Sequence, residues 1–203
     1  MIIIGITGSI GMGKSTISSM FKLLNIPIFD SDKEVKDILE KNYGVIKKIY
    51  KKWPETVLFF GKEQKINKKA LSDIIFKDID NRKILEKIIH PIVHNNRVRF
   101  IEKHRSSNFV GLDVPLLYET DTHKICDYIF LVNTSKKNQI KRVLARPNMT
   151  LAKFNLINEA QWSFEKKKKM SPFIINTSFG KLFSFVLIVV YLLWIILIRK
   201  KQK

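Results

Sequence analysis

The chain has 203 residues, 45% of them apolar, which suits one well-buried α/β domain with a small insertion or tail. Its one cysteine, Cys126, excludes an intramolecular disulfide, fits a reducing cytosol, and reads as a small core residue near a strand start. The formal charge is +19, but only seven of the 37 basic residues are Arg and the lysines are scattered. We therefore expect solvated faces that steer anionic substrates, and no nucleic-acid partner.

The first predicted elements are a strand, a glycine-rich loop and a helix. The apolar run 2–6 predicts a buried parallel strand, and 16–24 predicts a helix. Between them Gly8–Ser15 reads GSIGMGKS, a complete G-x-x-x-x-G-K-[ST] loop in the context that this motif requires. The loop and the helix N-terminus would cradle a phosphate. Lys14 would reach the β- and γ-phosphates and the Ser15 hydroxyl would bind Mg²⁺.

A second strand is predicted at 26–30, followed by a helix at 31–41. Asp30 and Asp32 stand at this junction. Phosphoryl transfer to an alcohol needs a carboxylate near the acceptor hydroxyl. The alternative is structural, with Asp30 or Ser31 capping the helix. One acid could cap while the other reacts, so the pair by itself leaves both interpretations open.

Residues 42–105 are lysine-rich and mostly helical in pattern, with no clear strand. We expect this stretch to be an insertion that covers a ligand cleft. His90–Pro91 closes an apolar helix pattern within it. From physical chemistry alone we favour His90 as a cap at a helix C-terminus, with a substrate-facing role as the alternative.

A third strand is predicted at 109–114, and its Asp113 resembles a Walker-B carboxylate, which holds the metal. A turn with a trailing acid follows at 115–119. Further elements are a strand at 128–132, a helix at 134–146 and a short strand at 173–176. Arg142 and Arg146 lie four apart, which suits a lid that closes on triphosphate charge or a solvated helix face.

Strands and helices thus alternate along the chain, which predicts a mostly parallel sheet with helices on both faces. In such sheets ligands bind at the carboxyl ends of the strands. The loop 8–15, the acids 30–32 and the segment 113–119 all fall at such ends. We therefore expect them to contribute to one site.

The run 182–198 carries no charge and is followed by a basic tail, 199–203. At about 1.5 Å per residue, its helix is at the short limit for crossing a bilayer. Three interpretations stay open: a membrane anchor, a fully buried helix, or a segment that no longer serves the fold. The location is expected to be cytoplasmic, with tethering to the inner face of the membrane as the alternative.

Taken together, these segments resemble the dephospho-CoA kinase family from Met1 to about Gly180. The P-loop is shared by many kinases, whereas the order of the other motifs is more specific. The matching segments are 6–16 (ITGSIGMGKST), Phe29–Asp32, Gly61, Ile66–Lys68, Leu71, Ile75–Phe76, Leu85–Glu86, Ile89–Pro91, Asp113–Glu119, Arg142–Arg146 and Ala160–Gln161.

The resemblance implies a P-loop three-layer α/β core (1–180) with a helical substrate-binding insertion (about 42–105) and a lid (about 136–165). It implies transfer of the ATP γ-phosphoryl group to the ribose 3′-hydroxyl of dephospho-coenzyme A, with Mg²⁺, by a monomer. Carried over by motif, Asp32 is the base or orienting group, Arg142 stabilises the transferring charge, and Lys14 assists. The ATP-binding residues would be Gly11, Met12, Gly13, Lys14, Ser15, Thr16 and Asn176; the acceptor-site residues Asp30, His90, Pro115, Leu116 and Glu119; and the metal-site residues Ser15 and Asp113.

Three features depart from the family pattern. Asn67–Lys68 replaces an Asp-Arg pair, Pro147 follows the arginine motif, and the uncharged run 182–198 replaces an amphipathic helix. Two other functions therefore stay open beside the kinase of coenzyme A synthesis. They are a nucleoside or nucleotide kinase and a membrane-tethered NTP-binding protein without catalysis.

Overall fold

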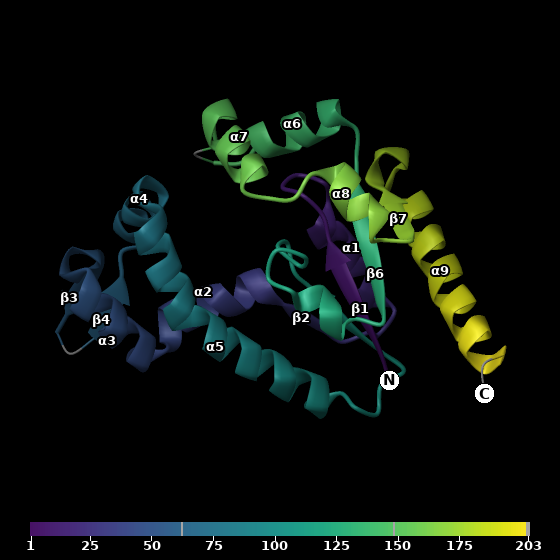
Figure 1. Ribbon diagram of the computed structural model, residues 1–203, viewed down its shortest axis with the longest axis horizontal. Coiled ribbons are helices and arrows are strands. Elements are labelled where there is room, and N and C mark those ends of the chain that lie inside the picture. The colour runs from purple at the N-terminus through teal and green to yellow at the C-terminus, as the bar shows by residue number, and fades with distance from the viewer. Residues whose placement is uncertain (62, 148, 202–203) are drawn as a thin grey trace. The chain divides into compact units, whose positions relative to one another are not determined.

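The computed structural model describes residues 1–61, 63–147 and 149–201 (Figure 1). The chain divides into two compact units. The core unit comprises Met1–Phe29 and His104–Lys203, and the inserted unit comprises Asp30–Lys103.

A five-stranded sheet with the order β2-β5-β1-β6-β7 organises the core unit. β1 pairs in parallel with β5, with Ile2 opposite Phe109, and with β6, with Ile4 opposite Tyr128. β6 in turn pairs in parallel with β7. The predicted mostly parallel sheet is confirmed. Its strands are β1 (Ile2–Thr7), β2 (Ile28–Asp30), β5 (Phe109–Asp113), β6 (Tyr128–Asn133) and β7 (Phe173–Asn176).

These strands form from nearly continuous apolar runs because helices cover the sheet. Figure 1 shows α1 and α9 beside β1, β6 and β7. Ile17 and Phe21 of α1 and Ile188 and Ile195 of α9 are fully buried with the sheet residues. The helices of this unit are α1 (Lys14–Leu23), α6 (Lys136–Leu144), α7 (Leu151–Glu159), α8 (Phe164–Lys169) and α9 (Lys181–Lys201), with short 3₁₀ turns η2 (Thr122–Ile125) and η3 (Thr177–Phe179).

Helix α9 corrects two interpretations of the uncharged run. Ile188, Leu192 and Ile195 are at most 7% exposed and belong to the main core, so the segment does serve the fold. The helix is not fully buried either, because Val190 and Leu193 are more than half exposed. Among the described residues α9 alone has the length and apolar composition to cross a membrane, which by itself is weak support for a span.

The inserted unit is mainly helical around its own core. Trp53, Leu85 and Ile89 are buried with apolar residues of neighbouring helices. Its elements are α2 (Ser31–Lys41), α3 (Tyr43–Lys52), η1 (Pro54–Thr56), β3 (Val57–Phe60), β4 (Glu63–Ile66), α4 (Lys68–Lys77) and α5 (Ile79–Lys103).

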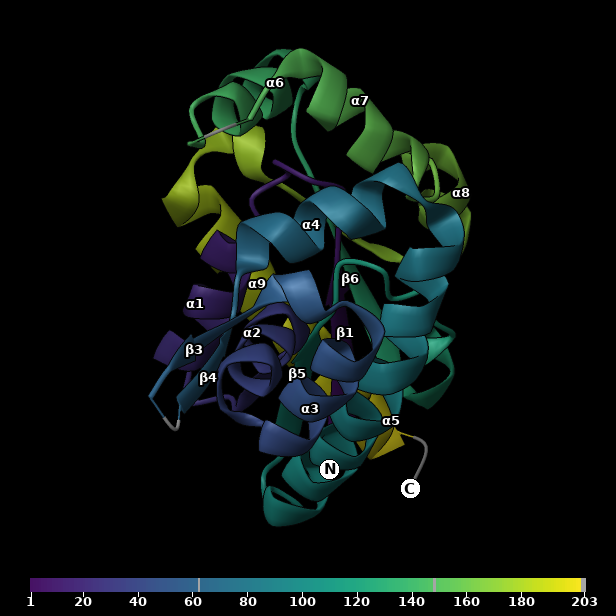
Figure 2. The same ribbon diagram turned by 90° about the vertical axis from the view of Figure 1, so that its left-hand side faces the viewer.

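The strands β3 and β4 correct the expectation of no strand in 42–105. They form an antiparallel hairpin in which Val57 lies opposite Ile66 and Phe60 opposite Glu63, with β4 close to α3 (Figure 2). Leu58, Phe59 and Phe60 are exposed. The polar–apolar alternation that marks a half-buried strand is therefore missing from the sequence.

The predicted helix end at His90 is also wrong. His90 and Pro91 lie inside α5, which runs on for another twelve residues to Lys103. Proline removes one intrahelical hydrogen bond, but burial of Leu85 and Ile89 holds the preceding turns in the helix. His90 is therefore an exposed mid-helix residue and caps no helix end.

Candidate active site

The loop between β1 and α1 has the backbone of a phosphate-binding loop. Gly11 and Gly13 have φ of +80° and +97°, which side-chain-bearing residues rarely adopt. A Cβ at Gly11 would also lie 2.5 Å from Val143 Cγ2. Gly13 is the N-cap of α1, and no side chain caps this helix. The Thr16 N–H donates to the Gly13 carbonyl at 3.0 Å, so the N-terminus of α1 offers an anion its partial positive charge and the N–H groups that precede Thr16.

Asp113 links the end of β5 to the phosphate-binding loop. Its carboxylate forms an ion pair with Lys14 Nζ and accepts a 2.6 Å hydrogen bond from Ser18 Oγ. Asp113 is 2% exposed. The predicted acid at this strand end therefore stands beside the motif lysine, and the pair fixes where the Lys14 ammonium lies.

Arg142 of α6 also reaches the phosphate-binding loop. Its guanidinium donates to Thr177 Oγ1 at 2.8 Å, and at 3.3 Å to the carbonyls of Thr177 and Met12. Thr177 Oγ1 in turn donates to the Met12 carbonyl at 2.9 Å. Arg142 is therefore an ordered charge at the loop rather than a residue of a solvated helix face.

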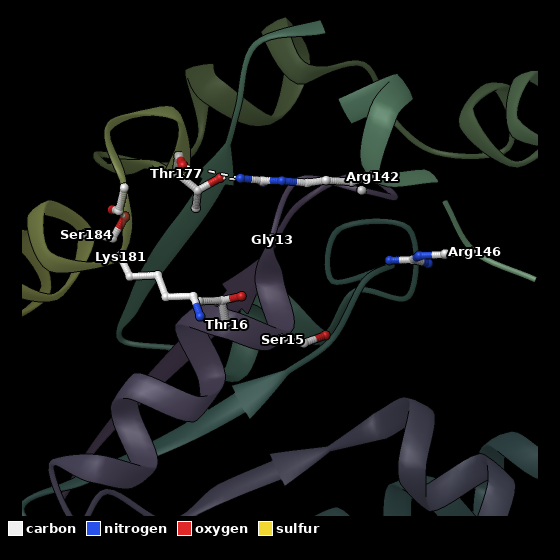
Figure 3. A pocket seen from close by; sticks show the side chains of 10 residues that line it. Gly13, Ser15, Thr16, Arg142, Arg146, Thr177, Lys181 and Ser184 are labelled. Atoms are coloured by element: carbon white, nitrogen blue, oxygen red, sulfur yellow. Dashed lines mark hydrogen bonds between the residues drawn. The ribbon is translucent and has the colours of Figure 1, made fainter. Parts of the chain in front are cut away.

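These groups border a cavity of about 360 Å³ (Figure 3). Arg142 points toward Thr177, and Lys181 extends alongside Thr16. The cavity combines a helix N-terminus with three cationic side chains, which suits a polyanionic ligand. Its lining comprises Gly11, Gly13, Ser15, Thr16, Arg142, Arg146, Thr177, Gly180, Lys181 and Ser184.

Asn176 directly precedes Thr177, which lines this cavity. Its Oδ1 accepts a 2.9 Å hydrogen bond from the Ser178 N–H, so its side chain caps η3. The neighbouring Thr177 supplies the lining group.

Glu119 has a bonding pattern that the sequence did not reveal. Its Oε1 accepts the Trp162 N–H at 2.6 Å and pairs with Lys167 Nζ at 3.1 Å. Lys167 is fully buried, and its Nζ also donates to the Pro115 carbonyl at 3.4 Å. Burial lowers the pKa of Lys167, and the charge of Glu119 partly opposes that shift. Glu119 thus fastens the loop after β5 to the start of α8.

The neighbouring aromatic residues strengthen this junction. The rings of Tyr118 and Trp162 stack with centroids 5.5 Å apart and planes 5° apart. The Tyr118 hydroxyl lies 2.5 Å from Ser171 Oγ, and burial, the larger effect, raises its pKa. Glu119, which was predicted to lie along the acceptor site, therefore uses Oε1 for bonds within the protein.

Two glutamines hold the peptide groups of Ile10 in the phosphate-binding loop. Gln161 Oε1 accepts the Ile10 N–H at 3.1 Å, and Gln139 Nε2 donates to the Ile10 carbonyl at 2.8 Å. Gln139 is 2% exposed. The sequence marked Gln161 only as part of a motif and did not single out Gln139. Gln139 could have been identified because it is a polar residue on the apolar face of the helix 136–144, where a buried side chain needs a hydrogen-bond partner.

The remaining predicted residues lie outside this cavity's lining. Asp30 Oδ1 accepts the Lys33 N–H at 3.0 Å, so Asp30 is the N-cap of α2, and Asp32 lies in the first turn of that helix. Pro115 and Leu116 are half-buried, and the Pro115 carbonyl accepts a 3.1 Å bond from Thr7 Oγ1.

The departure at 67–68 keeps its local structure. Asn67 Oδ1 accepts the Ala70 N–H at 3.2 Å, which caps α4, and Lys68 pairs with Glu40. Asparagine thus serves as an N-cap where the family has aspartate. Pro147 follows α6, which ends at Leu144, so the proline interrupts no helical hydrogen bond.

No group of three or more His, Cys, Asp or Glu side chains in the described residues could hold a metal ion. A divalent ion at the cavity would thus share its coordination with ligand oxygens. Ser15, exposed in the first turn of α1, offers a hydroxyl suited to such an ion.

The sequence is similar to those of known proteins. A family model described as dephospho-CoA kinase matches residues 2–181. The dephospho-CoA kinase of Bartonella quintana is 38% identical over 179 residues, covering 87% of this chain and 89% of that protein. That of Zymomonas mobilis is 36% identical over 176 residues, covering 87% of each.

Solved structures share the fold. A crystal structure from Thermus thermophilus superposes with a TM-score of 0.80 and 28% identity, covering 95% of this chain and 96% of that one. A dephospho-CoA kinase from Campylobacter jejuni gives a TM-score of 0.70 and 25% identity, with the same coverage.

Proposed function

The chain belongs to the dephospho-CoA kinase family, and from this premise we propose how its residues transfer the γ-phosphoryl group of ATP to the ribose 3′-hydroxyl of dephospho-CoA. The products are coenzyme A and ADP. The observation that carries the proposal is the ordered set of Lys14, Asp113 and Arg142 around a phosphate-binding loop.

At the ATP end, residues Gly11 to Thr16 bind the phosphates through the loop backbone and the N-terminus of α1, and Lys14 neutralises charge on the β- and γ-phosphates. The positive φ angles of Gly11 and Gly13 support this role, because they place the loop backbone around the start of α1. Met12 contributes by holding the loop in shape, because its carbonyl accepts from Arg142 and Thr177 and its N–H donates to the Ser9 carbonyl at 3.2 Å. Asn176 borders the adenine, with its cap of η3 fixing the neighbouring Thr177.

Arg142 stabilises the charge that develops on the transferring phosphoryl group. An arginine held by three hydrogen bonds needs little reorganisation when that charge appears. Arg146 lines the same cavity and adds positive charge to it.

Mg²⁺ would be held by Ser15 and by phosphate oxygens, with Asp113 as the nearby acid. When bound, it would neutralise charge on the β- and γ-phosphates. Both oxygens of Asp113 have protein partners, Lys14 and Ser18. Asp113 therefore also orients the motif lysine.

At the acceptor end, Asp32 positions the 3′-hydroxyl and takes its proton. Asp32 is assigned this role rather than Asp30, because the Asp30 carboxylate already accepts the capping hydrogen bond of α2. His90, Pro115 and Leu116 keep their proposed acceptor-site roles, together with Asp30. For Glu119 we propose that its contact with the acceptor is secondary to holding Trp162 and Lys167.

We assign the enzyme to the cytoplasm as a monomer whose partners are ATP and dephospho-CoA. Residues 42–105 would act as the acceptor-binding insertion and 136–165 as the lid. The lid assignment gains support from the bonds that Gln139 and Gln161 make with Ile10, since they join this segment to the phosphate-binding loop.

A coupled assay of ADP release tests the function. Dephospho-CoA should support turnover, whereas nucleosides and nucleoside monophosphates should not. Preference for a nucleoside or its monophosphate would move the chain to another kinase class, and ADP release independent of any acceptor would reject a kinase role.

The Asp32→Asn variant tests the mechanism in the same assay. It should bind ATP as the wild type does and lose most of its turnover with dephospho-CoA. Undiminished kcat would remove Asp32 from the mechanism. An Asp37→Asn variant, on the same helix and paired with the exposed Lys41, is the matched control and should keep full activity.

A further inference from the structure

Helix α9 presents two apolar faces with different surroundings. One face packs in the core through Ile188, Leu192 and Ile195. The other is open to solvent over most of the helix length, although it is equally apolar. Its exposed residues, which we call the outer stripe, are Phe183, Val186, Val190, Leu193 and Leu197, each between 50% and 61% exposed. Trp194 is 49% exposed but packs the edge of its ring against Phe173, with centroids 5.5 Å apart.

The outer stripe follows the spacing of a continuous helix face, because residues three and four apart are neighbours on a helix. Soluble proteins rarely leave a contiguous apolar surface of this kind uncovered. The stripe also lies beyond residue 181, where the match to the family model ends. The proposed phosphoryl transfer uses none of these side chains.

Positive charge flanks the outer stripe. Residues 166–203 contain nine Lys and Arg residues and no Asp or Glu; one of the nine, Lys167, is buried against Glu119 and adds nothing to the surface charge. Lys166, Lys168 and Lys169 precede α9 and are exposed, and Arg199 and Lys200 follow the apolar run. Lys181, in the first turn of α9, lines the nucleotide cavity instead. An apolar stripe between basic ends matches an anionic membrane surface, where acyl chains accept the apolar side chains and headgroups accept the cations.

Net charge argues against a second copy of the chain as the occupant. Each copy carries a formal charge of +19, and pairing two outer stripes would bring like-charged segments together. An anionic bilayer has the complementary charge.

The buried face argues against a transmembrane orientation. Tyr191 donates through its hydroxyl to the Ile174 carbonyl at 3.3 Å, and Arg199 donates to the Met1 carbonyl at 3.2 Å. Ile188 and Ile195 are fully buried in the same core as the residues of β1. A helix that crossed the bilayer would have to leave all of these contacts.

We propose that α9 lies in the plane of an anionic membrane surface, with the outer stripe inserted at the headgroup–acyl boundary and the core face retained in the protein. The kinase is then a reversibly bound peripheral enzyme. The first turn of α9 also lines the nucleotide cavity through Lys181 and Ser184. The cavity therefore adjoins the end of the membrane-contacting helix.

Sedimentation of the full-length protein with vesicles tests this proposal. Vesicles of equal parts phosphatidylglycerol and phosphatidylcholine should bind about tenfold or more protein than phosphatidylcholine alone, and high salt should weaken this binding. The Val190→Gln/Leu193→Gln/Leu197→Gln variant should lose about tenfold or more of the binding while keeping kinase activity. The matched control, Leu23→Gln/Leu58→Gln/Ile79→Gln, changes exposed apolar residues elsewhere and should bind as the wild type does.

A second variant guards against misfolding of the first. Lys200→Gln/Lys201→Gln/Lys203→Gln leaves the apolar residues intact. It should reduce binding to the vesicles that contain phosphatidylglycerol and leave the weak binding to pure phosphatidylcholine unchanged. Absence of vesicle binding, or binding that both variants retain, would overturn the proposal. The proposal would also be overturned if bound protein resisted extraction by alkaline carbonate, which indicates a spanning helix. A dimer of the wild type that the outer-stripe variant dissociates would overturn it too.

Discussion

The Glu119–Lys167 pair offers the sharpest test of the energetics of this fold. The Glu119→Gln variant keeps the side-chain shape and can still accept the Trp162 N–H, but it removes the charge that faces Lys167. Lys167 is fully buried, so its ammonium would lose its counter-ion in a site from which water is excluded. Removing one partner of a buried ion pair costs about 3–5 kcal/mol.

The ionisation of Lys167 sets an upper limit to that loss. The lysine can release its proton instead of staying charged, and from the usual pKa of 10.5 this costs about 5 kcal/mol at pH 7. Burial already lowers this pKa in the wild type, so the actual limit is smaller. A loss of about 3–4 kcal/mol corresponds to a decrease in Tm of roughly 6–16 °C for a domain of this size.

Urea and thermal unfolding at pH 7 measure this loss. The control is the double variant Glu119→Gln/Lys167→Met, which removes the buried cation as well and should recover most of the lost stability. If the single variant loses less than about 1 kcal/mol of unfolding free energy, or the double variant is no more stable than the single, the pair does not stabilise this junction.

Three other predictions concern the phosphate-binding loop, the cap of α2 and the pH dependence of stability. Gly11→Ala should abolish ATP binding in calorimetry, because the added Cβ meets Val143 within 2.5 Å and φ is +80°. Asp30→Ala should destabilise the fold by about 1 kcal/mol through loss of the α2 cap, whereas Asp30→Asn should be nearly neutral in urea unfolding. The third is a pH dependence. Since the folded state holds the pKa of Lys167 below 10.5, the unfolded chain binds more protons between the two pKa values. The unfolding free energy of the wild type relative to Lys167→Met should therefore rise with pH toward 10.5; a flat or falling difference would contradict the shift.

The sheet and its phosphate-binding loop could be predicted because they depend on local sequence. Buried parallel strands are continuous apolar runs, and the glycines of the loop are required by its backbone angles. The strand at 173–176 and the helix at 31–41 were predicted with their observed bounds. Asp113 could be placed because a strand end fixes where its last side chain goes.

The parts that escaped prediction depend on tertiary contacts. The hairpin β3–β4 exposes most of its apolar side chains, so its pattern carries no alternation. The continuation of α5 past Pro91 depends on packing that outweighs one lost hydrogen bond. The partners of Glu119 lie 43 and 48 positions along the chain, at Trp162 and Lys167, and no spacing rule relates them. The two faces of α9 look alike in sequence because both are apolar.

The sheet order also has a consequence for how the chain is made. β1 occupies the centre of the sheet, yet its neighbours begin at Phe109 and Tyr128. On a ribosome the first strand is therefore exposed for the time needed to synthesise about a hundred further residues. The inserted unit, whose contacts are local, emerges meanwhile and can form its helices first. Ile2, Ile4 and Ile6 are thus the residues that a nascent-chain chaperone would meet longest, and slower translation before residue 109 should increase aggregation rather than relieve it.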